Sequence, residues 1–371
     1  MRLDLAILVL VVTALVAWLG WQTRTTEPGV EAIGLAQVLG DAPAHFRRVT
    51  EPVALEFPRD HGAHPDYRSE WWYFTGNFET ADGQRLGFQF TLFRFALNEA
   101  QTAQSDWATD TLWMAHLALS DGRSRRFFQA ERFARGALEL AGATESRWWL
   151  RDWVVNATPS GWHLVADGGD FALELNLDQV RPLVLQGDSG YSRKGPEPGN
   201  ASRYYSATRL EASGRIRLDQ QWLEVTGLAW LDREWGSNQL SETLAGWDWF
   251  ALHLDDGRDL MVYRLRDHDG NASPWSAGAL VERDGSSRTL QHTDFTADAL
   301  AWWRDPDGQR WPLSWRIRVP DAGLDLTTRP LFEDQLWTRS VRYWEGMIDV
   351  IDSASGQPLG RGYTELSGYA E

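Results

Sequence analysis

The chain has 371 residues, 43% of them hydrophobic, which is typical of a globular protein long enough for two cores. Its net charge of −16 repels phosphate backbones and argues against a nucleic-acid partner. The absence of cysteine excludes thiol catalysis, cysteine-ligated zinc, disulfides and a lipidated amino-terminal cysteine.

The first predicted element is an unbroken apolar run over residues 5–21, LAILVLVVTALVAWLGW. It is long for the core of a signal peptide and near the lower length for a membrane span. We therefore predict export, with residues 1–21 acting as a cleaved signal or as an anchor that contacts the membrane. The protein would then be periplasmic, secreted or held at the inner membrane facing the periplasm. Residues 22–50 are expected to form a tether.

From residue 51 onward, short alternating runs are separated by Asp-Gly, Gly-Gly and Ser-Gly. This pattern is typical of antiparallel strands joined by tight turns. In RLGFQFTLFR (85–94) and DFALELNLD (170–178), every second residue is apolar, which gives each strand one core face. No long helical pattern follows residue 21, so the fold is predicted to be all-β.

Five segments of the first half recur in the same order in the second half. The pairs are 71–90 with 247–265, 116–125 with 279–288, 171–185 with 324–332, 203–214 with 342–353, and 227–236 with 362–371. We infer a duplication with domains over 51–240 and 241–371. Each unit has enough strands to close into a barrel that holds one small ligand. The prediction is two tandem lipocalin-like antiparallel β-barrels preceded by an N-terminal hydrophobic segment.

Histidines and carboxylates cluster in DHGAHPDYRSEWW, residues 60–72. Metal binding is one interpretation, but the helical HExxH spacing is absent and Pro65 interrupts the pattern. A polar entry loop is the other, and no metal site is predicted. Glu70 adjoins tryptophans, where desolvation would raise the pKa of the carboxyl and suit a general acid. A structural pair with Arg68 or another surface arginine is the alternative.

Three further residues are catalytic candidates. His116 shares a strand face with Met114 and Ala118, and it is either an acid–base group or a satisfied core histidine. Asp232 and Glu234 lie at a strand end near the domain joint. They are either the acid of a catalytic site or part of an interdomain salt-bridge cluster.

Tryptophan is the outlier of the composition, with 22 residues that recur as WW or WxW. These rings either pack between strands or form an aromatic wall around a ligand. The residues predicted to contact a ligand are Trp72, Tyr73, Tyr204, Trp235, Trp249 and Tyr263. No cofactor is predicted, because no GxGxxG follows a strand and no P-loop is present.

The tetrapeptide GDSG (187–190) also surrounds the nucleophile of chymotrypsin-like serine proteases. Here Tyr191 stands where those proteases have a further glycine, and no histidine lies in their Ala-His-Cys setting. The stretch is therefore interpreted as a turn whose glycines permit a positive φ. Ser189, Ser192 and Lys194, the single lysine of the chain, remain candidates for the mouth of a site.

Several stretches carry a resemblance to a known family, in order, over about residues 50–371. They are EWWYFTG (70–76), GDSGYSRKG (187–195), RYYS (203–206), DREWG (232–236), GWDWFALHLDDG (246–257) and GRGYTELSGY (360–369). The chain resembles the AttH / carotenoid 1,2-hydratase (CrtC)-like family of secreted, lipocalin-like proteins. The resemblance implies two lipocalin-like domains and an association with an ABC-type exporter.

Some members of the family hydrate the terminal double bond of acyclic carotenoids, which requires an acid that protonates carbon. The resemblance implies Asp232 or Glu234 as that acid, with the ring of Trp235 stabilising the cation. A histidine at the position of Arg233 would strengthen this assignment.

Three functions remain open at this point. The first, which we favour, is an exported module that binds an apolar small molecule such as a lipid or isoprenoid. The second is an enzyme, either a hydratase or a hydrolase, that acts on a lipophilic substrate by carboxylate acid–base catalysis. The third is an accessory subunit that contacts an ABC-type membrane transporter.

Overall fold

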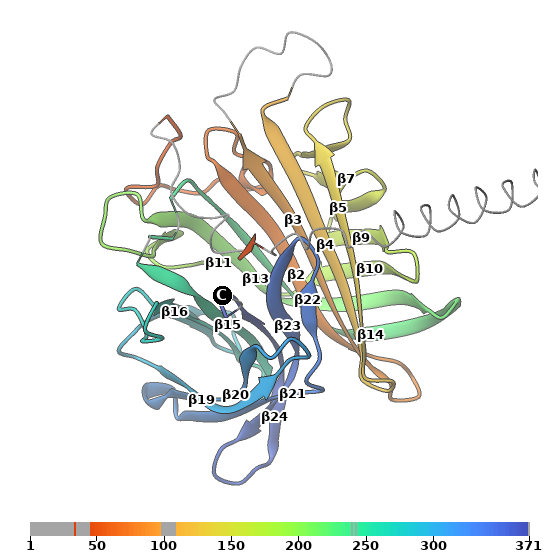
Figure 1. The fold of residues 1–371 in the computed structure, drawn as a ribbon, viewed down its shortest axis with the longest axis vertical. Helices are drawn as coiled ribbons and strands as arrows, with labels where there is room; N and C mark the ends of the chain where they lie inside the picture. The colour runs from red at the N-terminus through yellow and green to blue at the C-terminus, as the bar shows by residue number, and fades with distance from the viewer. Residues whose placement is uncertain (1–32, 35–44, 98–108, 239, 242, 370–371) are drawn as a thin grey trace, which may run out of the picture.

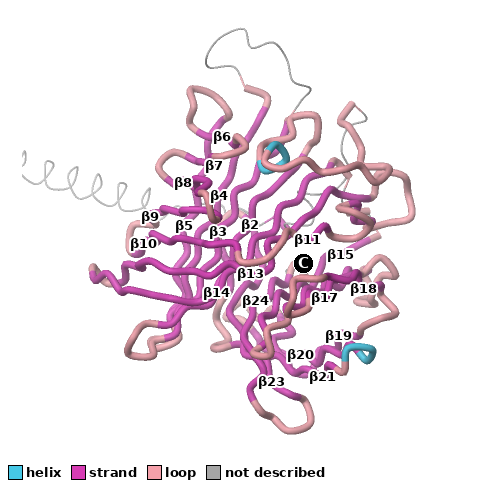
Figure 2. Tube along the Cα trace, turned by 180° about the vertical axis from the view of Figure 1, so that it is seen from behind, coloured by secondary structure: helices cyan, strands magenta, loops and turns pink. Residues whose placement is uncertain are grey.

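The computed structural model consists of two β-sheets with almost no helix (Figures 1 and 2). It describes residues 33–34, 45–97, 109–238, 240–241 and 243–369. Within these residues, helical structure is limited to two 3-10 turns, η1 (Arg59–His61) and η2 (Pro320–Ala322). The apolar run 5–21 lies outside the described residues. No helix in the described part of the chain is long and apolar enough to cross a membrane.

The first sheet contains thirteen of the described strands, all from the first two thirds of the chain. They are β2 (Ser69–Glu79), β3 (Arg85–Ala96), β4 (Thr111–Asp121), β5 (Arg126–Arg135), β6 (Ala141–Ala143), β7 (Arg147–Leu150), β8 (Trp153–Thr158), β9 (Gly161–Asp167), β10 (Phe171–Gln179), β11 (Val184–Leu185), β12 (Tyr191–Arg193), β13 (Ala201–Leu218) and β14 (Gln221–Gly236). Their antiparallel order is β5-β4-β3-β2-β14-β13-β10-β9-β8-β7-β6, with β11 and β12 added on β13.

The second sheet contains eleven of the described strands. They are β1 (Ile33–Gly34), β15 (Leu244–Leu254), β16 (Asp259–Asp267), β17 (Ala277–Val281), β18 (Ser287–Gln291), β19 (Thr296–Arg304), β20 (Arg310–Val319), β21 (Leu324–Pro330), β22 (Leu336–Thr338), β23 (Val341–Asp352) and β24 (Pro358–Leu366). The order is β18-β17-β16-β15-β24-β23-β21-β20-β19, with β1 and β22 paired to β23. Only β1 among these pairs in parallel.

The two sheets share one strand order, as a duplication would produce. If β2, β3, β4 and β5 are matched to β15, β16, β17 and β18, the next strands along each sheet also match. Thus β14, β13, β10, β9 and β8 correspond to β24, β23, β21, β20 and β19. The five repeated sequence segments fall on equivalent strands under this correspondence.

The all-β prediction with two antiparallel, lipocalin-like sheets is confirmed, with one difference in closure. In the described residues, no backbone hydrogen bonds join the end strands of either sheet. The first sheet is nearly closed, because Arg132 of β5 reaches across to the Asp152 carboxylate and the Asp167 carbonyl. The second sheet forms a half-barrel.

Each sheet packs a core of its own against its concave face. The alternating residues predicted from the sequence, such as Phe88 and Phe90 of β3 and Leu173 and Leu175 of β10, are buried in the first core. Burial of each such side chain stabilises the fold by about 1.5–3 kcal/mol. Aromatic and aliphatic side chains also fill the second core. The interior of the first sheet is therefore filled by side chains, whereas the second half-barrel keeps a hollow lined in part by Phe295, Ala297 and Trp315.

The two sheets pack against each other through their outer faces. Strand β2 lies against β24 and β3 against β23, where the orange strands of the first sheet meet the blue strands of the second in Figure 1. At this contact Asn77 Nδ2 donates to the Gly362 carbonyl at 3.0 Å. Met347 lies so close to Gly87 that a Cβ there would be 2.9 Å from its sulfur.

The residues predicted as a tether are partly attached to this body. Ile33 and Gly34 pair with β23, although they precede the first sheet in the chain. Phe46 and Val49 are buried, and the Arg47 carbonyl accepts a hydrogen bond from Ser237 at the end of the first sheet. The amino-terminal region thus contacts both sheets before the first of them begins.

Candidate functional site

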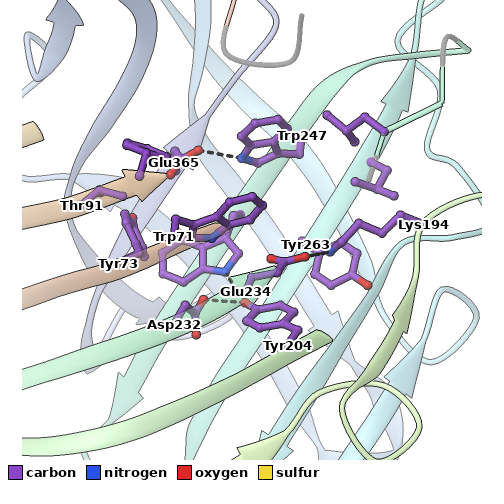
Figure 3. A pocket seen from close by; sticks show the side chains of 14 residues that line it. Trp71, Tyr73, Thr91, Lys194, Tyr204, Asp232, Glu234, Trp247, Tyr263 and Glu365 are labelled. Carbon is purple, nitrogen blue, oxygen red and sulfur yellow. Dashed lines mark hydrogen bonds and ion pairs between the residues drawn. The ribbon is translucent and has the colours of Figure 1, made fainter. Parts of the chain in front are cut away.

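An aromatic pocket lies between the two sheets (Figure 3). It encloses about 700 Å³ of space not filled by protein atoms, including its mouth. Its lining residues are Trp71, Tyr73, Thr91 and Phe93 from β2 and β3, Lys194 from the loop after β12, Tyr204 from β13, Asp232 and Glu234 from β14, Leu240, Trp247 and Trp249 at and before β15, Tyr263 and Leu265 from β16, and Glu365 from β24. Aromatic rings therefore surround a small group of charged side chains.

Strand alternation explains why these residues face the pocket. In β14, Asp232 and Glu234 point to the outer face of the first sheet, whereas the residues between and after them point to its inner face. In β15 and β16, Trp249 and Tyr263 sit opposite each other on the face that meets the first sheet. Six of the ten predicted site residues come together here: Tyr73, Tyr204, Asp232, Glu234, Trp249 and Tyr263.

Asp232 is a buried carboxyl in the wall of the pocket. It accepts hydrogen bonds from Tyr204 Oη at 2.5 Å, Ser206 Oγ at 2.5 Å and Trp230 Nε1 at 2.7 Å. These three donors favour the ionised form, but burial disfavours it more, and Glu234 adds repulsion. The net effect raises the pKa of Asp232 to about 6. This carboxyl can therefore hold or release a proton near neutral pH.

Glu365 places a second carboxyl in the same pocket. It accepts a hydrogen bond from Trp247 Nε1 at 2.7 Å, drawn as a dashed line in Figure 3. Burial raises the pKa of Glu365 to about 7, and the negative charges of Asp232 and Glu234 act in the same direction. Two carboxyls that titrate close to neutrality thus face one aromatic cavity.

Glu234 differs from these two because it has a cationic partner. Lys194 Nζ lies 2.9 Å from its carboxylate, and Ser202 Oγ donates to the same carboxylate at 2.5 Å. The ammonium group also lies over the rings of Tyr204 and Tyr263, at 5.2 and 4.5 Å from their centroids. Burial lowers the pKa of Lys194, but Glu234, Tyr263 and Asp232 together raise it by more, so the lysine stays protonated. It is not available as a nucleophile.

Glu70 does not line this pocket, and its environment is the reverse of the predicted one. It lies on the inner face of β2 at one end of the first sheet, where Arg94, Arg233 and His64 contact its carboxylate. Burial works to raise the pKa of Glu70, but the two guanidinium charges hold it well below its usual range. Glu70 is therefore a permanently ionised structural carboxylate, and the expected raised pKa is wrong.

Trp72 and Trp235 also face the inside of the first sheet. The Arg233 guanidinium lies between them, 3.8 and 4.8 Å from their ring centroids. The His64 ring stacks on Trp235 at 3.9 Å and nearly parallel. Because its faces are already occupied, Trp235 cannot present its ring to a substrate cation, as the resemblance had implied.

His116 lies outside the pocket and is fully buried. Its Nδ1 is 2.8 Å from Tyr343 Oη, its Nε2 is 3.0 Å from Glu131, and its ring stacks on Trp337. Burial lowers the pKa of the imidazole, although Glu131 opposes this. His116 therefore does not touch the space that a ligand would occupy.

The histidine-rich segment before β2 caps the same end of the first sheet. His61 Nδ1 is 2.6 Å from Tyr205 Oη, and His64 donates its backbone N–H to Glu70. Among the described residues, no group of three or more His, Asp or Glu side chains is arranged to hold a metal ion. Residues 60–68 form a polar loop before β2, which is the second of the two interpretations of this segment.

The GDSG stretch is a tight turn. Asp188 and Tyr191 exchange two backbone hydrogen bonds, at 3.0 and 2.9 Å, with Ser189 and Gly190 between them at positive φ. The exposed Ser189 hydroxyl contacts only the Asp188 carboxylate, at 3.3 Å, in the described structure. This confirms the predicted turn. Of the three candidates for a site mouth, Lys194 lines the pocket and Ser192 bonds to Tyr263 Oη at 3.1 Å.

Comparison with protein families gives a match to the AttH-like model over residues 48–369. The chain belongs to the AttH-like family. A crystal structure of a protein assigned as AttH from Nitrosomonas europaea is similar to it, with 37% identity, a TM-score of 0.79, and coverage of 87% of this chain and 100% of the other. Comparison with curated proteins returned no match.

Two more distant structures share the fold. Kievitone hydratase from Nectria haematococca aligns at a TM-score of 0.63 with 13% identity, covering 89% of this chain and 98% of its own. CghA aligns at a TM-score of 0.51 with 13% identity, covering 90% and 98%. At this level of identity the similarity concerns the arrangement of the strands.

Sequence reasoning missed seven pocket residues: Trp71, Thr91, Phe93, Leu240, Trp247, Leu265 and Glu365. Two of the signals were present in this AttH-like chain. Trp71 and Trp247 occupy equivalent positions of the first repeated segment, together with Tyr73 and Trp249 two residues later. Glu365 lies two residues from Tyr363 in an alternating strand. The sequence alone does not show that the two sheets meet through their outer faces.

Proposed function

We propose that the pocket between the sheets binds an apolar small molecule and adds water to one of its carbon–carbon double bonds, with Asp232 as the general acid. The observation that carries this proposal is the Asp232 carboxyl itself. It lies in an aromatic cavity with a pKa of about 6, close to the value at which a carboxylic acid can donate a proton at neutral pH.

The reaction would run in two steps. The Asp232 carboxylic acid transfers its proton to one alkene carbon, so the π electrons form the new C–H bond and the neighbouring carbon becomes a cation. The ring of Trp249 lines the same cavity and can stabilise this cation. A water molecule then adds to the cation and loses one proton to the Asp232 carboxylate. The net change is the addition of one water, and the acid is regenerated.

The other charged groups of the pocket suit this chemistry. Glu365 offers a second carboxyl with a pKa of about 7, which can orient the water or take up its proton. The ion pair between Glu234 and Lys194 leaves the cavity wall with little net charge beside Asp232. The name of kievitone hydratase, whose fold is similar, describes the same class of reaction and supports the proposal.

The test is water addition to lipophilic alkenes. The purified protein is incubated in heavy-oxygen water with kievitone and with acyclic isoprenoids that carry a terminal double bond. Mass spectrometry then follows the incorporation of one labelled water. Asp232→Asn is expected to lower turnover by a factor of about 10² or more, because a general acid contributes a factor of about 10²–10⁴. Asp188→Asn, at the exposed turn, is the matched control and should keep full turnover.

Carriage of an apolar ligand without chemistry is the second function that the pocket supports, because most of its lining is aromatic or aliphatic. Native mass spectrometry with organic extraction distinguishes the two. A substrate that is retained but never gains water, in the wild type as in Asp232→Asn, would contradict the hydratase and leave the carrier.

We propose in addition that residues 5–21 direct export and that an ABC-type transporter is a partner, as the family resemblance implies. The apolar run and its flanking arginines, Arg2 and Arg24, support the first part. Fractionation of cells that express the full chain, compared with a chain lacking residues 1–21, tests export. Crosslinking in the membrane fraction tests the partner, and recovery in the cytoplasm would contradict both.

A further inference from the structure

Glu345 is a buried carboxyl that the proposed reaction does not use. It lies on β23, and Tyr73 Oη donates to it at 2.5 Å from the wall of the pocket. Tyr343 lies two residues before it on the same strand, with its side chain on the same face. None of the ion pairs in the described structure includes Glu345, and Glu365 faces it directly across the β23–β24 ladder.

This environment keeps a proton on Glu345. Burial raises the pKa of Glu345 well above its usual range, and the negative charge of Glu365 acts in the same direction. Two tyrosine hydroxyls oppose these effects without supplying a positive charge. Glu345 thus stores a proton next to Tyr73, which reaches the pocket.

From Glu345 the hydrogen-bonded groups continue away from the pocket. Tyr343 Oη lies 2.8 Å from His116 Nδ1. The other ring nitrogen, Nε2, is 3.0 Å from the Glu131 carboxylate, but the contact is too poorly aligned to be a hydrogen bond. Glu131 lies on β5, the edge strand of the first sheet, with 12% of its side chain exposed, and Ser340 Oγ donates to it at 2.5 Å.

We propose that Glu345, Tyr343 and His116 form a proton path that joins the pocket, through Tyr73, to the edge of the first sheet at Glu131. Every member belongs to a different element from the catalytic candidate Asp232, and the groups span both sheets. The purpose of the path, which is to equilibrate the pocket with bulk water during acid–base chemistry, rests on the proposed function. The path itself rests on the geometry of these five side chains.

One proton moves at each step, and no group is oxidised or reduced. A proton that enters from solvent at Glu131 passes to His116 Nε2, while the proton on Nδ1 passes to Tyr343 Oη. The Tyr343 proton passes to Glu345. Once the Tyr73 hydroxyl has turned from Glu345 toward the pocket, the Glu345 proton passes to Tyr73 Oη, which releases its own proton into the pocket. A proton that moves the opposite way along the path restores the starting arrangement, including the Nδ1–H form of His116.

A buried polar chain of this kind could instead serve only to join the sheets, so the test must measure proton movement. The readout is the carbonyl stretch of protonated Glu345, followed by infrared spectroscopy after rapid mixing with heavy water and identified by its loss in Glu345→Gln. A mildly alkaline pH is used, because Asp232 and Glu365, with pKa values of about 6 and about 7, are then ionised. No substrate is present.

The measurement is made in a Tyr73→Phe background, which blocks exchange from the pocket side. Glu345 is expected to exchange rapidly in this background through His116. Adding His116→Phe should slow exchange by about tenfold or more, because deuterium then enters only through local opening of the protein. His253→Phe is the matched control, since His253 is also buried between the sheets but bonds to the Thr208 carbonyl instead.

Equal exchange rates with and without His116→Phe would overturn the proposal. If that variant fails to fold, Glu131→Gln carries the test, because this side chain is partly exposed and its removal should slow exchange several-fold. The outcome is independent of the reaction. Undiminished turnover in Asp232→Asn would defeat the hydratase and leave the exchange result standing, whereas unchanged exchange would defeat the path alone.

Discussion

The two faces of β14 hold two buried carboxylate clusters with opposite properties. On the inner face, Arg233 and Arg94 surround Glu70 and hold its pKa well below the usual range. On the outer face, Asp232 accepts hydrogen bonds from neutral donors, the nearby Lys194 ammonium is paired with Glu234, and burial raises the pKa of Asp232 to about 6. Burial is nearly complete on both faces. The comparison shows that the charge of the partners, more than burial, separates a structural carboxylate from one that can exchange protons.

The largest expected effect is on the inner face. Arg233→Met removes one of the two cations from Glu70 and should lower the free energy of unfolding by about 3–5 kcal/mol, because it leaves a buried charge without full compensation. Denaturant unfolding measures the change. Arg215→Met, which breaks the exposed pair with Glu174, is the control and should cost less than about 1 kcal/mol. A decrease in the free energy of unfolding below about 1 kcal/mol for Arg233→Met would contradict the difference described between the two faces.

The next effect is the pH dependence of the free energy of unfolding, which has opposite signs for the carboxyls on the two faces of β14. The pKa of Asp232 is raised from 3.8 to about 6. Its contribution to the free energy of unfolding is therefore fully present below pH ~4 and is lost as the pH rises through about 6. Relative to Asp232→Asn, the wild type should lose about 3 kcal/mol across this window. Glu70 has a lowered pKa, so the advantage of wild type over Glu70→Gln should be present at neutral pH and fall as the solution is acidified.

Unfolding curves collected at a series of pH values give both profiles. Two parallel profiles would show that the faces do not differ in the way described. For the same reason, turnover that depends on protonated Asp232 should decline as the pH rises above about 6.

A smaller effect concerns ligand affinity. Trp249→Phe trims a ring that lines the pocket and removes its hydrogen bond of 3.3 Å to Tyr204 Oη. The affinity for a fluorescent apolar probe should fall about tenfold, which corresponds to about 1.4 kcal/mol. Trp235→Phe, on the inner face, is the matched variant and should leave the affinity for the probe unchanged. If both variants weaken binding equally, the probe does not occupy the pocket between the sheets.

The smallest effect is expected at the turn that resembles a protease motif. Ser189 is exposed, and in the described structure its hydroxyl contacts only the neighbouring Asp188. Ser189→Ala should therefore change neither the stability, by more than about 0.5 kcal/mol, nor any turnover of lipophilic substrates. Loss of a hydrolytic activity in this variant would instead support the interpretation of Ser189 as a nucleophile.

Strand alternation and the internal repeat predicted much of this fold. The apolar faces of 85–94 and 170–178 lie in the first core as expected, and the five repeated segments fall on equivalent strands of the two sheets. The site was predicted in part, because Asp232, Tyr204 and Trp249 were selected on sound grounds. Glu70 and Trp235 were selected on the same grounds and lie elsewhere.

The reason for this partial success is physical. Alternation tells which residues of a strand share a face, but not which of the two faces meets the other sheet. Asp232 and Arg233 are adjacent in the chain and point in opposite directions. The pKa of Glu70 likewise depends on Arg94 and Arg233, which are 24 and 163 positions away along the chain. Only the assembled sheets bring these charges together.

The contact between Tyr73 and Trp249 carries a consequence for the history of the molecule. These rings occupy equivalent positions of the two repeats, and they touch each other, with centroids 5.2 Å apart. Tyr73 also bonds to β23, and Trp249 bonds to β13, the strand equivalent to β23. The two sheets therefore meet through the same patch of surface, as the subunits of a symmetric dimer do. A chain made of two fused copies would place its pocket in this way, with unlike residues at equivalent positions of a shared surface: Tyr73 from one repeat and Trp249 from the other.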